Sequence, residues 1–289
     1  MKPTITTDLV RALIAEQFPQ WTDLPVTPVP RQGWDNRTFR LGDQLSVRLP
    51  SAEGYVAAVE KENRWLPELA GHLPLPVPSP VAVGRPGAGY PYPWSVRQWL
   101  TGDTLEDAAA VDRLRLARDL GEFLTVLRQA PVAGPPGGRH SFFRGCHPSA
   151  YADGVEQALK ELGDAVDVRA CRAVWAEALD SSWESAPVWF HGDIAVGNLL
   201  VRDGRLAAVI DFGTCGVGDP ACDLVIAWNT LEGDERAAFR DAVGLDRQTW
   251  QRARGWALWK ALIMLAEPGA APAWRHVVDQ VLADPVGSS

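Results

Sequence analysis

The chain has 289 residues, of which 46% are hydrophobic and 22% charged, so it can form one large globular domain or two closely joined lobes. Its 28 lysines and arginines against 36 aspartates and glutamates give a formal net charge of −8, which argues against a nucleic-acid partner. The four cysteines form no Cys-x-x-Cys pair and the first 18 residues lack an apolar leader core, so we expect reduced thiols in a cytoplasmic protein. No apolar run reaches the length of a membrane-spanning helix, so we expect no membrane association, and no feature of the sequence identifies a protein partner.

The first hundred residues show one helix, a series of strands and a second helix. Helical spacing of apolar residues and the two-residue period of strands distinguish the two kinds of element. The predicted elements, in chain order, are a helix over 7–18 capped by Thr7, strands over 38–41 and 44–49, a helix over 55–69 and strands over 81–83 and 94–100.

Beyond residue 100 the composition shifts towards helix formers. The predicted elements are helices over 105–110, 113–128, 151–162 and 168–179, an extended segment over 186–190, a hairpin of strands 198–201 and 207–210, and helices over 234–243, 246–266 and 274–283. We therefore predict an α+β fold in two lobes. A small antiparallel sheet lobe would occupy residues 1–100, and a larger, mainly helical lobe would occupy residues 101–289.

Two short runs after residue 188 have the composition of a catalytic site. His191-Gly192-Asp193 is followed by Asn198, and a strand later comes Asp211 with Phe-Gly behind it. The Asp193 carboxylate can orient a hydroxyl and accept its proton, while the oxygens of Asn198 and Asp211 suit Mg²⁺, because hard cations prefer oxygen ligands. The hairpin between them would set Asn198 and Asp211 side by side. Either run alone is equally consistent with an ordinary loop or strand-end acid, but both together reproduce the order of catalytic parts in protein kinases.

Two further residues are expected to support this site. His191 is interpreted as a structural residue that holds the loop, because the rest of the motif supplies the chemistry. Gly218-Asp219-Pro220 forms a turn into a helix, and Asp223 would lie one turn inside that helix. From there its carboxylate can hydrogen-bond to the backbone of the catalytic loop.

The kinase order assigns nucleotide contacts to the first lobe. Gly33 and Asn36 lie in a polar turn whose backbone N–H groups can cover phosphates, although such a turn is equally typical of a plain hairpin. Arg48 occupies the place of the phosphate-binding lysine, and it keeps the charge with a longer, differently shaped fork. Glu60 and Glu62 are two residues apart on a helix and face different directions, so only one can meet Arg48. We favour Glu62, which lies beside the buried stripe.

The segment that joins the lobes is the expected adenine site. Gln98, Trp99 and Leu100 would line an apolar slot whose backbone bonds the edge of the base. Trp99 is equally interpretable as a core residue.

The motifs His-Gly-Asp-x4-Asn, Asp-Phe-Gly and Gly-Asp-Pro-x2-Asp-Leu together resemble the aminoglycoside-phosphotransferase family, which belongs with choline kinases to the wider kinase-like group. The resemblance covers about residues 25–265 and implies a two-lobed, protein-kinase-like fold that uses Mg²⁺ and ATP or GTP. It implies transfer of the γ-phosphate to a hydroxyl of a small molecule, with Asp193 as catalytic base or substrate orienter. It also implies that Asn198 and Asp211 bind Mg²⁺ and that Arg48 contacts phosphates with Glu62 behind it, although this family usually has lysine at the Arg48 position.

The resemblance places the acceptor between the catalytic loop and the C-terminal helices. An acidic lining there would suit a polyamine antibiotic, and the candidate acids are Glu232, Asp234 and Glu267. A tryptophan-rich lining would suit a macrolide or another less charged alcohol, and the candidate walls are Trp228, Trp256 and Trp259.

Three functions remain open from the sequence. The first is an antibiotic O-phosphotransferase acting on an aminoglycoside or a macrolide. The second is a metabolite kinase acting on a sugar, a choline-like alcohol or an amino alcohol. The third is a catalytically weak, kinase-like binding module.

Overall fold

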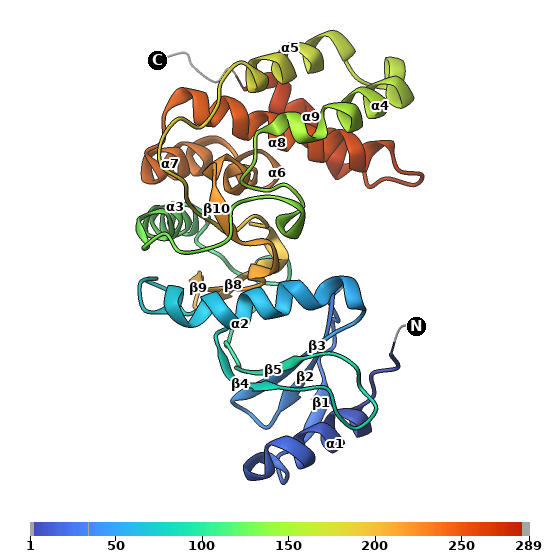
Figure 1. Cartoon of the computed structure of the whole chain (residues 1–289). Coiled ribbons are helices and arrows are strands. Elements are labelled where there is room, and N and C mark those ends of the chain that lie inside the picture. The colour runs from blue at the N-terminus through green and yellow to red at the C-terminus, as the bar shows by residue number, and fades with distance from the viewer. Residues whose placement is uncertain (1–2, 34, 285–289) are drawn as a thin grey trace. The chain divides into compact units, whose positions relative to one another are not determined.

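The computed structural model describes residues 3–33 and 35–284, and it divides into two compact units (Figure 1). The first unit comprises Met1–Asp103 and Ala207–Gly213, and the second comprises Thr104–Leu206 and Thr214–Ser289. The return of Ala207–Gly213 to the first unit differs from the simple division at residue 100 expected from the sequence. Trp34, inside the predicted polar turn, lies outside the described residues.

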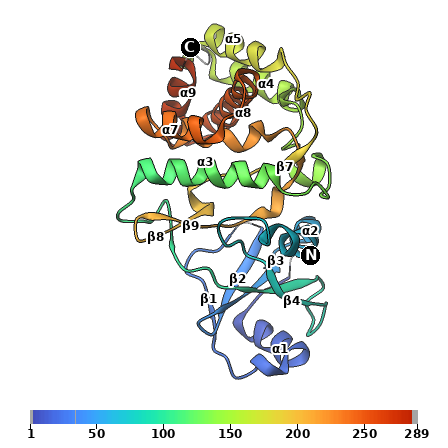
Figure 2. The same cartoon turned by 90° about the vertical axis from the view of Figure 1, so that its left-hand side faces the viewer.

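The first unit is built on an antiparallel sheet with the strand order β1-β2-β3-β5-β4. One helix lies on each side of this sheet in both views (Figures 1 and 2). The strands are β1 (Val26–Pro28), β2 (Asn36–Leu41), β3 (Leu45–Pro50), β4 (Pro80–Gly84) and β5 (Trp94–Gln98), and the helices are α1 (Thr7–Gln17) and α2 (Val56–Ala70).

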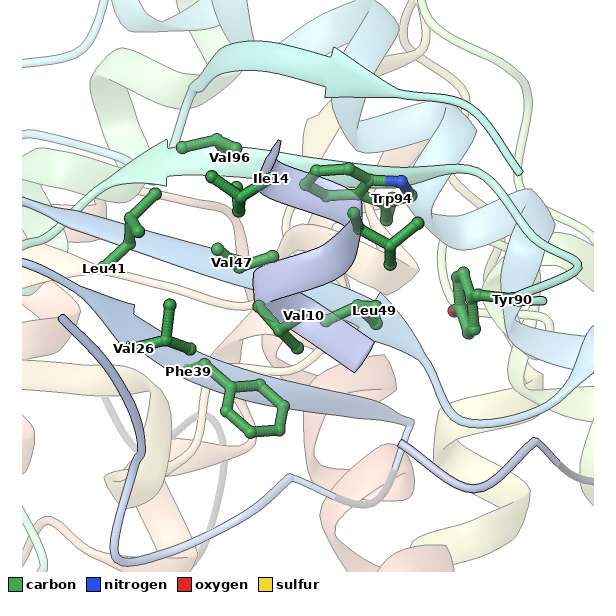
Figure 3. Packing of buried hydrophobic residues seen from close by; sticks show 11 residues of the cluster. Val10, Ile14, Val26, Phe39, Leu41, Val47, Leu49, Tyr90, Trp94 and Val96 are labelled. Carbon is green, nitrogen blue, oxygen red and sulfur yellow. The ribbon is translucent and has the colours of Figure 1, made fainter. Parts of the chain in front are cut away.

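Alternation along the strands gives the sheet one apolar and one polar face. Val47 and Val96 are directly opposite each other and fully buried, and they pack with Val10 and Ile14 of α1 (Figure 3). The neighbouring positions point to the other face, which carries Arg48 on β3. The apolar face therefore forms the core of the first unit, and the polar face is available for chemistry.

The cap of α1 differs from the prediction by one residue. Thr6, not Thr7, is the N-cap, because its backbone is extended and its hydroxyl accepts a hydrogen bond of 3.2 Å from the N–H of Leu9. A capping side chain must precede the first helical residue in order to reach a free N–H group.

The second unit is mainly helical. Its helices are α3 (Arg113–Gln129), α4 (Ala152–Leu162), α5 (Val168–Leu179), α6 (Ile226–Asn229), α7 (Gly233–Val243), α8 (Arg247–Ala266) and α9 (Ala273–Ala283). Figure 2 shows α3 running beside α7, where Gly121 leaves no room for a Cβ atom against Ala242. Gly255 allows the same close approach of α8 to Ala178 on α5. In this unit β7 (Val188–Phe190) pairs with β10 (Gly216–Gly218) in antiparallel fashion and leads into the catalytic loop.

The predicted helix over 105–110 is wrong. The chain there forms β6 (Asp103–Thr104) and then turns. The N–H of Leu105 donates to the carbonyl of Leu199, and the Thr104 hydroxyl accepts from the N–H of Asp107. The Thr104 hydroxyl thus caps one helical turn, which the N–H of Ala108 closes on the Thr104 carbonyl, and the chain does not continue this turn into a helix.

The predicted hairpin around Asp203-Gly204 is present. It joins β8 (Leu199–Arg202) to β9 (Arg205–Val209) in a sheet of order β6-β8-β9. Asp203 and Gly204 have φ values of 54° and 76°, the left-handed pair that a two-residue hairpin loop requires. Across the described ranges, none of the helices combines the length and apolar character needed to span a bilayer.

Candidate active site

The polar face of the first unit centres on Arg48. Its guanidinium donates to Glu62 at 3.1 Å and to Asp211 at 2.8 Å, so one side chain links α2, β3 and the returning segment. Burial opposes the charge, but the carboxylates of Glu62 and Asp211 outweigh it and hold the pKa of Arg48 above its ordinary value. The ion partner of Arg48 on α2 is thus Glu62, and Glu60 is exposed.

Glu62 also pairs with a second arginine that the sequence analysis did not single out. Arg97 donates to the other oxygen of Glu62 at 3.1 Å, and both side chains are almost wholly buried, with exposures of 1% and 0%. Burial lowers the pKa of Arg97, against the opposing field of Glu62. The sequence does contain a signal that could have identified Arg97. Side chains alternate between the two faces along Trp94-Ser95-Val96-Arg97, and since Val96 faces the core, Arg97 must lie on the face of Arg48.

Asp211 has an unusual backbone conformation. Its φ is 66°, in the left-handed region that costs a non-glycine residue about 1–3 kcal/mol. The carboxylate is 41% exposed while one of its oxygens accepts from Arg48. This conformation holds an acid at the boundary between a buried arginine and solvent.

The other predicted nucleotide residues lie at the edges of the same sheet. Asn36 begins β2 and is buried, and its Oδ1 has no hydrogen-bond partner within the described ranges. Gly33 is exposed, and its carbonyl accepts from Arg37 at 2.7 Å. The roles of both in nucleotide binding remain predictions.

The predicted adenine segment follows β5. Gln98 is exposed, whereas Trp99 and Leu100 are half-buried. The N–H of Trp99 donates to the carbonyl of Gln44, and the Arg40 guanidinium lies 4.1 Å from the centroid of the Trp99 ring. That N–H is therefore already used within the sheet, and the base-binding role of the segment remains a prediction.

In the second unit, a hydrogen-bond network fixes the backbone of the catalytic loop. The buried carboxylate of Asp223 accepts from the N–H of His191 at 2.8 Å and from the N–H of Gly192 at 2.6 Å. His191 is fully buried, and its Nδ1 accepts from the N–H of Asp193 at 3.1 Å. The Thr214 hydroxyl closes the network by donating to the carbonyl of His191. Asp193 is thus exposed on a loop whose backbone is fixed by hydrogen bonds to buried side chains.

Asp193 and Asn198 are in direct contact. The Asn198 amide donates both to the backbone carbonyl and to Oδ2 of Asp193, at 2.9 Å each. The amide nitrogen is used in this way, so the amide oxygen of Asn198 is the atom available to a cation. Loop geometry and the short helical turn Val196–Asn198 bring these two residues together.

Two buried carboxylates, of Asp219 and Asp223, lie next to the catalytic loop and the Gly-Asp-Pro turn. Burial raises the pKa of Asp223 above its ordinary value, against the lowering effect of the two backbone hydrogen bonds from Gly192 and His191. Asp219 of the Gly-Asp-Pro turn forms a buried ion pair of 2.6 Å with Arg252 on α8. Arg252 was not identified from the sequence, because nothing local distinguishes it from a surface arginine of α8.

The candidate acceptor acids are on the C-terminal helices. Glu232 precedes the first residue of α7, and its carboxylate accepts from His276 of α9 at 2.8 Å. Asp234 is exposed in the first turn of α7, and Glu267 is exposed at the end of α8. The structure records no hydrogen bond or ion pair from these three acids to Asp193 among the residues it describes, and their substrate role remains a prediction.

Asn198 and Asp211 are the predicted magnesium ligands, and each belongs to a different unit of the structure. Each side chain by itself offers an amide or carboxylate oxygen, the ligand type that Mg²⁺ prefers. Their joint coordination of one ion remains a prediction.

An antiparallel sheet unit with an Arg–Glu pair, and a helical unit with an Asp–Asn loop, define the class of kinase-like proteins. The sequence model of the "Phosphotransferase enzyme family" matches residues 26–256, most of the chain, and the chain belongs to this family.

Individual relatives agree with this assignment. An aminoglycoside 3'-phosphotransferase from Streptomyces fradiae is 28% identical over 176 residues, which cover 57% of this chain and 63% of the relative. The chain spans less than two thirds of the length of the curated relatives it matches.

Solved structures share the fold. The GDP complex of wild-type aminoglycoside 2'-phosphotransferase-IIIa has a TM-score of 0.71 at 19% identity, covering 96% of this chain and 99% of that one. Macrolide 2'-phosphotransferase MphH from Brachybacterium faecium has a TM-score of 0.60 at 24% identity, covering 96% and 99%. The predicted kinase-like α+β fold and the family resemblance are confirmed.

Proposed function

We propose that the protein is a Mg²⁺-dependent O-phosphotransferase that moves the γ-phosphoryl group of ATP or GTP to a hydroxyl of a small molecule. The observation that carries the proposal is the direct bond between Asn198 and Asp193 on a loop held by Asp223. Such a loop presents one carboxylate to an acceptor and one amide oxygen to a cation. The Arg48–Glu62–Asp211 arrangement of the first unit supports it, because a fixed cation and an adjacent acid suit a nucleotide's phosphates.

The reaction needs alignment and charge neutralisation more than covalent participation by the protein. Asp193 orients the acceptor hydroxyl, whose oxygen forms a bond to the γ-phosphorus while the bond from that phosphorus to the β–γ bridging oxygen breaks. The nucleoside diphosphate leaves, and the hydroxyl proton passes to Asp193 and then to solvent. Arg48 holds phosphate oxygens in place. Mg²⁺, held by Asn198 and Asp211, would supply neutralisation of the phosphate charge when bound.

Two acceptor classes fit this chemistry. Relatives named as aminoglycoside and macrolide phosphotransferases favour an antibiotic hydroxyl, and a metabolite alcohol is the alternative. Cys146, Cys171 and Cys222 are free thiols, as suits an enzyme of the reducing cytoplasm, where nucleoside triphosphates are abundant.

Asp193→Asn tests the assignment of the base. The substitution removes the proton acceptor but keeps the size of the side chain, so we expect the rate of transfer to fall by about 10²–10⁴-fold. Nucleotide affinity should stay unchanged. Acceptors would be found by following nucleoside diphosphate release with Mg²⁺ and ATP or GTP against aminoglycosides, macrolides, peptide antibiotics and metabolite alcohols.

Asp203→Asn is the matched control, because Asp203 is an exposed acid in the hairpin turn after β8. It should leave both rate and affinity unchanged. A near-normal rate in Asp193→Asn would contradict the assignment. Absence of turnover with every acceptor, together with absence of Mg²⁺-dependent nucleotide binding, would favour a binding module instead.

A further inference from the structure

A loop between α3 and α4 is fixed against the strand that leads into the catalytic loop. Gly145 packs on the ring of Phe190, where a Cβ atom would lie 1.9 Å from a ring carbon. The carbonyl of Gly145 accepts from the N–H of Asp219, and the N–H of Gly137 donates to the carbonyl of Val217 on β10. Since Phe190 precedes His191-Gly192-Asp193 directly, this loop is tied to the site described above.

Arg144 of this loop lies on a group of aromatic side chains. Its guanidinium is 5.2 Å from the centroid of the Trp259 ring and donates to the Tyr151 hydroxyl at 3.4 Å. Tyr151 and Trp259 are stacked at 3.9 Å, and Trp256 meets both rings edge-on, at 5.7 and 5.5 Å. Trp256 and Trp259 are buried, with exposures of 2% and 5%, so the half-buried ring of Tyr151 is the part of this group that a flat apolar ligand can reach.

Lys260 adds a second cation to this group. It follows Trp259 in α8 and is half-buried, and its ammonium makes no hydrogen bond or ion pair within the described ranges. Burial lowers the pKa of Lys260, the charge of Arg144 lowers it further, and the Asp193 carboxylate opposes both. Lys260 therefore shares one electrostatic environment with the acid that faces the acceptor. A half-buried ammonium without a protein partner is costly unless a ligand supplies one.

The outer part of the same loop is strained and exposes aromatic rings. Phe142 and Phe143 both have left-handed backbones, with φ of 49° and 57°, and are 53% and 39% exposed. Phe143 meets Tyr151 edge-on at 6.3 Å, so it continues the aromatic surface outwards. Two consecutive left-handed residues are strained, and the surrounding contacts must offset this strain.

We propose that Arg144 and Lys260, with the accessible rings of Tyr151 and Phe143, form an acceptor subsite that selects an alcohol carrying an anionic oxygen group next to a flat apolar part. The proposal rests on the function proposed above and narrows its acceptor class. Two cations against the single carboxylate of Asp193 attract a carboxylate or phosphate through charge-assisted hydrogen bonds. They repel a polyamine, so aminoglycosides are poor acceptors despite the names of the relatives.

The test uses benzyl alcohols that share a ring and a hydroxymethyl group and differ in the para substituent. The anionic probes are 4-(hydroxymethyl)benzoate and 4-(hydroxymethyl)phenyl phosphate, the neutral probe is 4-(hydroxymethyl)benzamide, and the cationic probe is 4-(aminomethyl)benzyl alcohol. Dissociation constants come from saturation-transfer NMR with the full chain, and turnover comes from probe-dependent nucleoside diphosphate release. We expect at least one anionic probe to bind about tenfold more tightly than the neutral probe, and the cationic probe to bind most weakly. The better of the two anionic probes identifies carboxylate or phosphate as the preferred group.

Variants then assign the preference to the subsite. Lys260→Met should reduce the preference for the anionic probe by about tenfold, and Lys260→Glu should shift it towards the cationic probe. Lys160→Met, at an exposed position of α4, is the matched control and should leave the preference unchanged. Lys260→Met should not lower the melting temperature, because burial already makes the charge of Lys260 unfavourable to folding.

Equal affinity for all four probes, including no binding of any, would overturn the subsite, as would an unchanged preference in Lys260→Met. Turnover that favours aminoglycosides and the cationic probe would overturn the subsite and leave the proposed function standing. A charge preference in binding without any Mg²⁺-dependent diphosphate release would leave the subsite standing and overturn the proposed function.

Discussion

Arg48 stands at the place where the family usually has lysine, and its geometry gives a reason. A guanidinium presents several donors in a fixed plane, so Arg48 reaches Glu62 and Asp211 at once. An ammonium at the end of a lysine would have to reach both carboxylates with a single nitrogen. Glu62 also forms an ion pair with Arg97, so two guanidinium groups balance the charge of this buried carboxylate.

Replacing Arg48 should therefore affect both stability and nucleotide binding. Arg48→Met leaves Asp211 without this cation and weakens the pairing of buried Glu62, so we expect the free energy of unfolding to fall by about 3 kcal/mol. The KM for nucleotide should rise about tenfold or more, since a charged hydrogen bond to phosphate is lost. Arg48→Lys keeps the charge and should show the smaller change in both quantities. Urea unfolding and steady-state kinetics measure the two effects.

Arg64→Met provides the control on the same helix. Arg64 pairs with Glu68 on the exposed face of α2, where an ion pair contributes little. We expect its free energy of unfolding to stay within about 0.5 kcal/mol of the wild type. If Arg48→Met and Arg64→Met lowered the free energy of unfolding equally, the ion pairs of Arg48 would contribute no more to stability than an exposed ion pair.

At the scale of elements, the loop that carries Arg144 depends on one glycine. Gly145 has a φ of 78° and lies against Phe190, so both its conformation and its surroundings exclude a side chain. The strand β7 lies directly behind this contact and positions the catalytic loop. A shift of the loop that carries Arg144 should therefore change the position of Asp193.

The glycine pair Gly145 and Gly244 separates these two effects. Gly244 ends α7 in the left-handed region, with φ 62° and ψ 27°, and the nearest atom to the place of its Cβ is 4.0 Å away. We expect Gly244→Ala to cost about 1 kcal/mol for the backbone alone. Gly145→Ala should cost about 1–3 kcal/mol more through overpacking against Phe190. Urea unfolding of both variants gives the comparison, and equal costs would mean that the ring of Phe190 moves aside freely.

At the scale of the whole molecule, the chain does not divide into two consecutive segments. Ala207–Gly213 leaves the second unit after Leu206 and joins the first unit, where it brings Asp211 to Arg48. The first unit is therefore complete only when the chain has been made as far as residue 213. The predicted phosphate-binding residue Arg48 therefore has its partner Asp211 only when the chain extends that far.

Ligand removal tests this view on the full chain. Nucleotide with Mg²⁺ at a hundred times its dissociation constant should stabilise the folded state by about 2.7 kcal/mol, which raises the melting temperature by roughly 5–10 °C. Chelation of Mg²⁺ with EDTA should remove most of this shift. Asp211→Asn should remove the same Mg²⁺-dependent part, and Asp203→Asn should retain it. The same shift with and without EDTA would contradict a role for Mg²⁺ in nucleotide binding.

Local sequence carried much of the fold. Periods of two and 3.6 residues predicted most strands and helices, and the Asp203-Gly204 pair predicted its hairpin, because these signals depend on neighbouring residues alone. The errors were local too. The N-cap of α1 is Thr6, whereas Thr7 was predicted. A turn that begins at Thr104 stands where a helix over 105–110 was predicted.

The chain by itself determined the chemistry of the site, because the spacing of Asp193, Asn198 and Asp211 is written in two short motifs. Tertiary structure decided what surrounds these residues. The sheet register places Arg97 on the same face as Arg48. The packing of α2 on this face lets Glu62 form an ion pair with each of the two arginines. The fold of a distant loop against Phe190 set Arg144 over the Trp259 ring of α8, next to Lys260 in the sequence. Such contacts join residues far apart in the sequence, and their energies depend on burial and distance, which no local pattern contains.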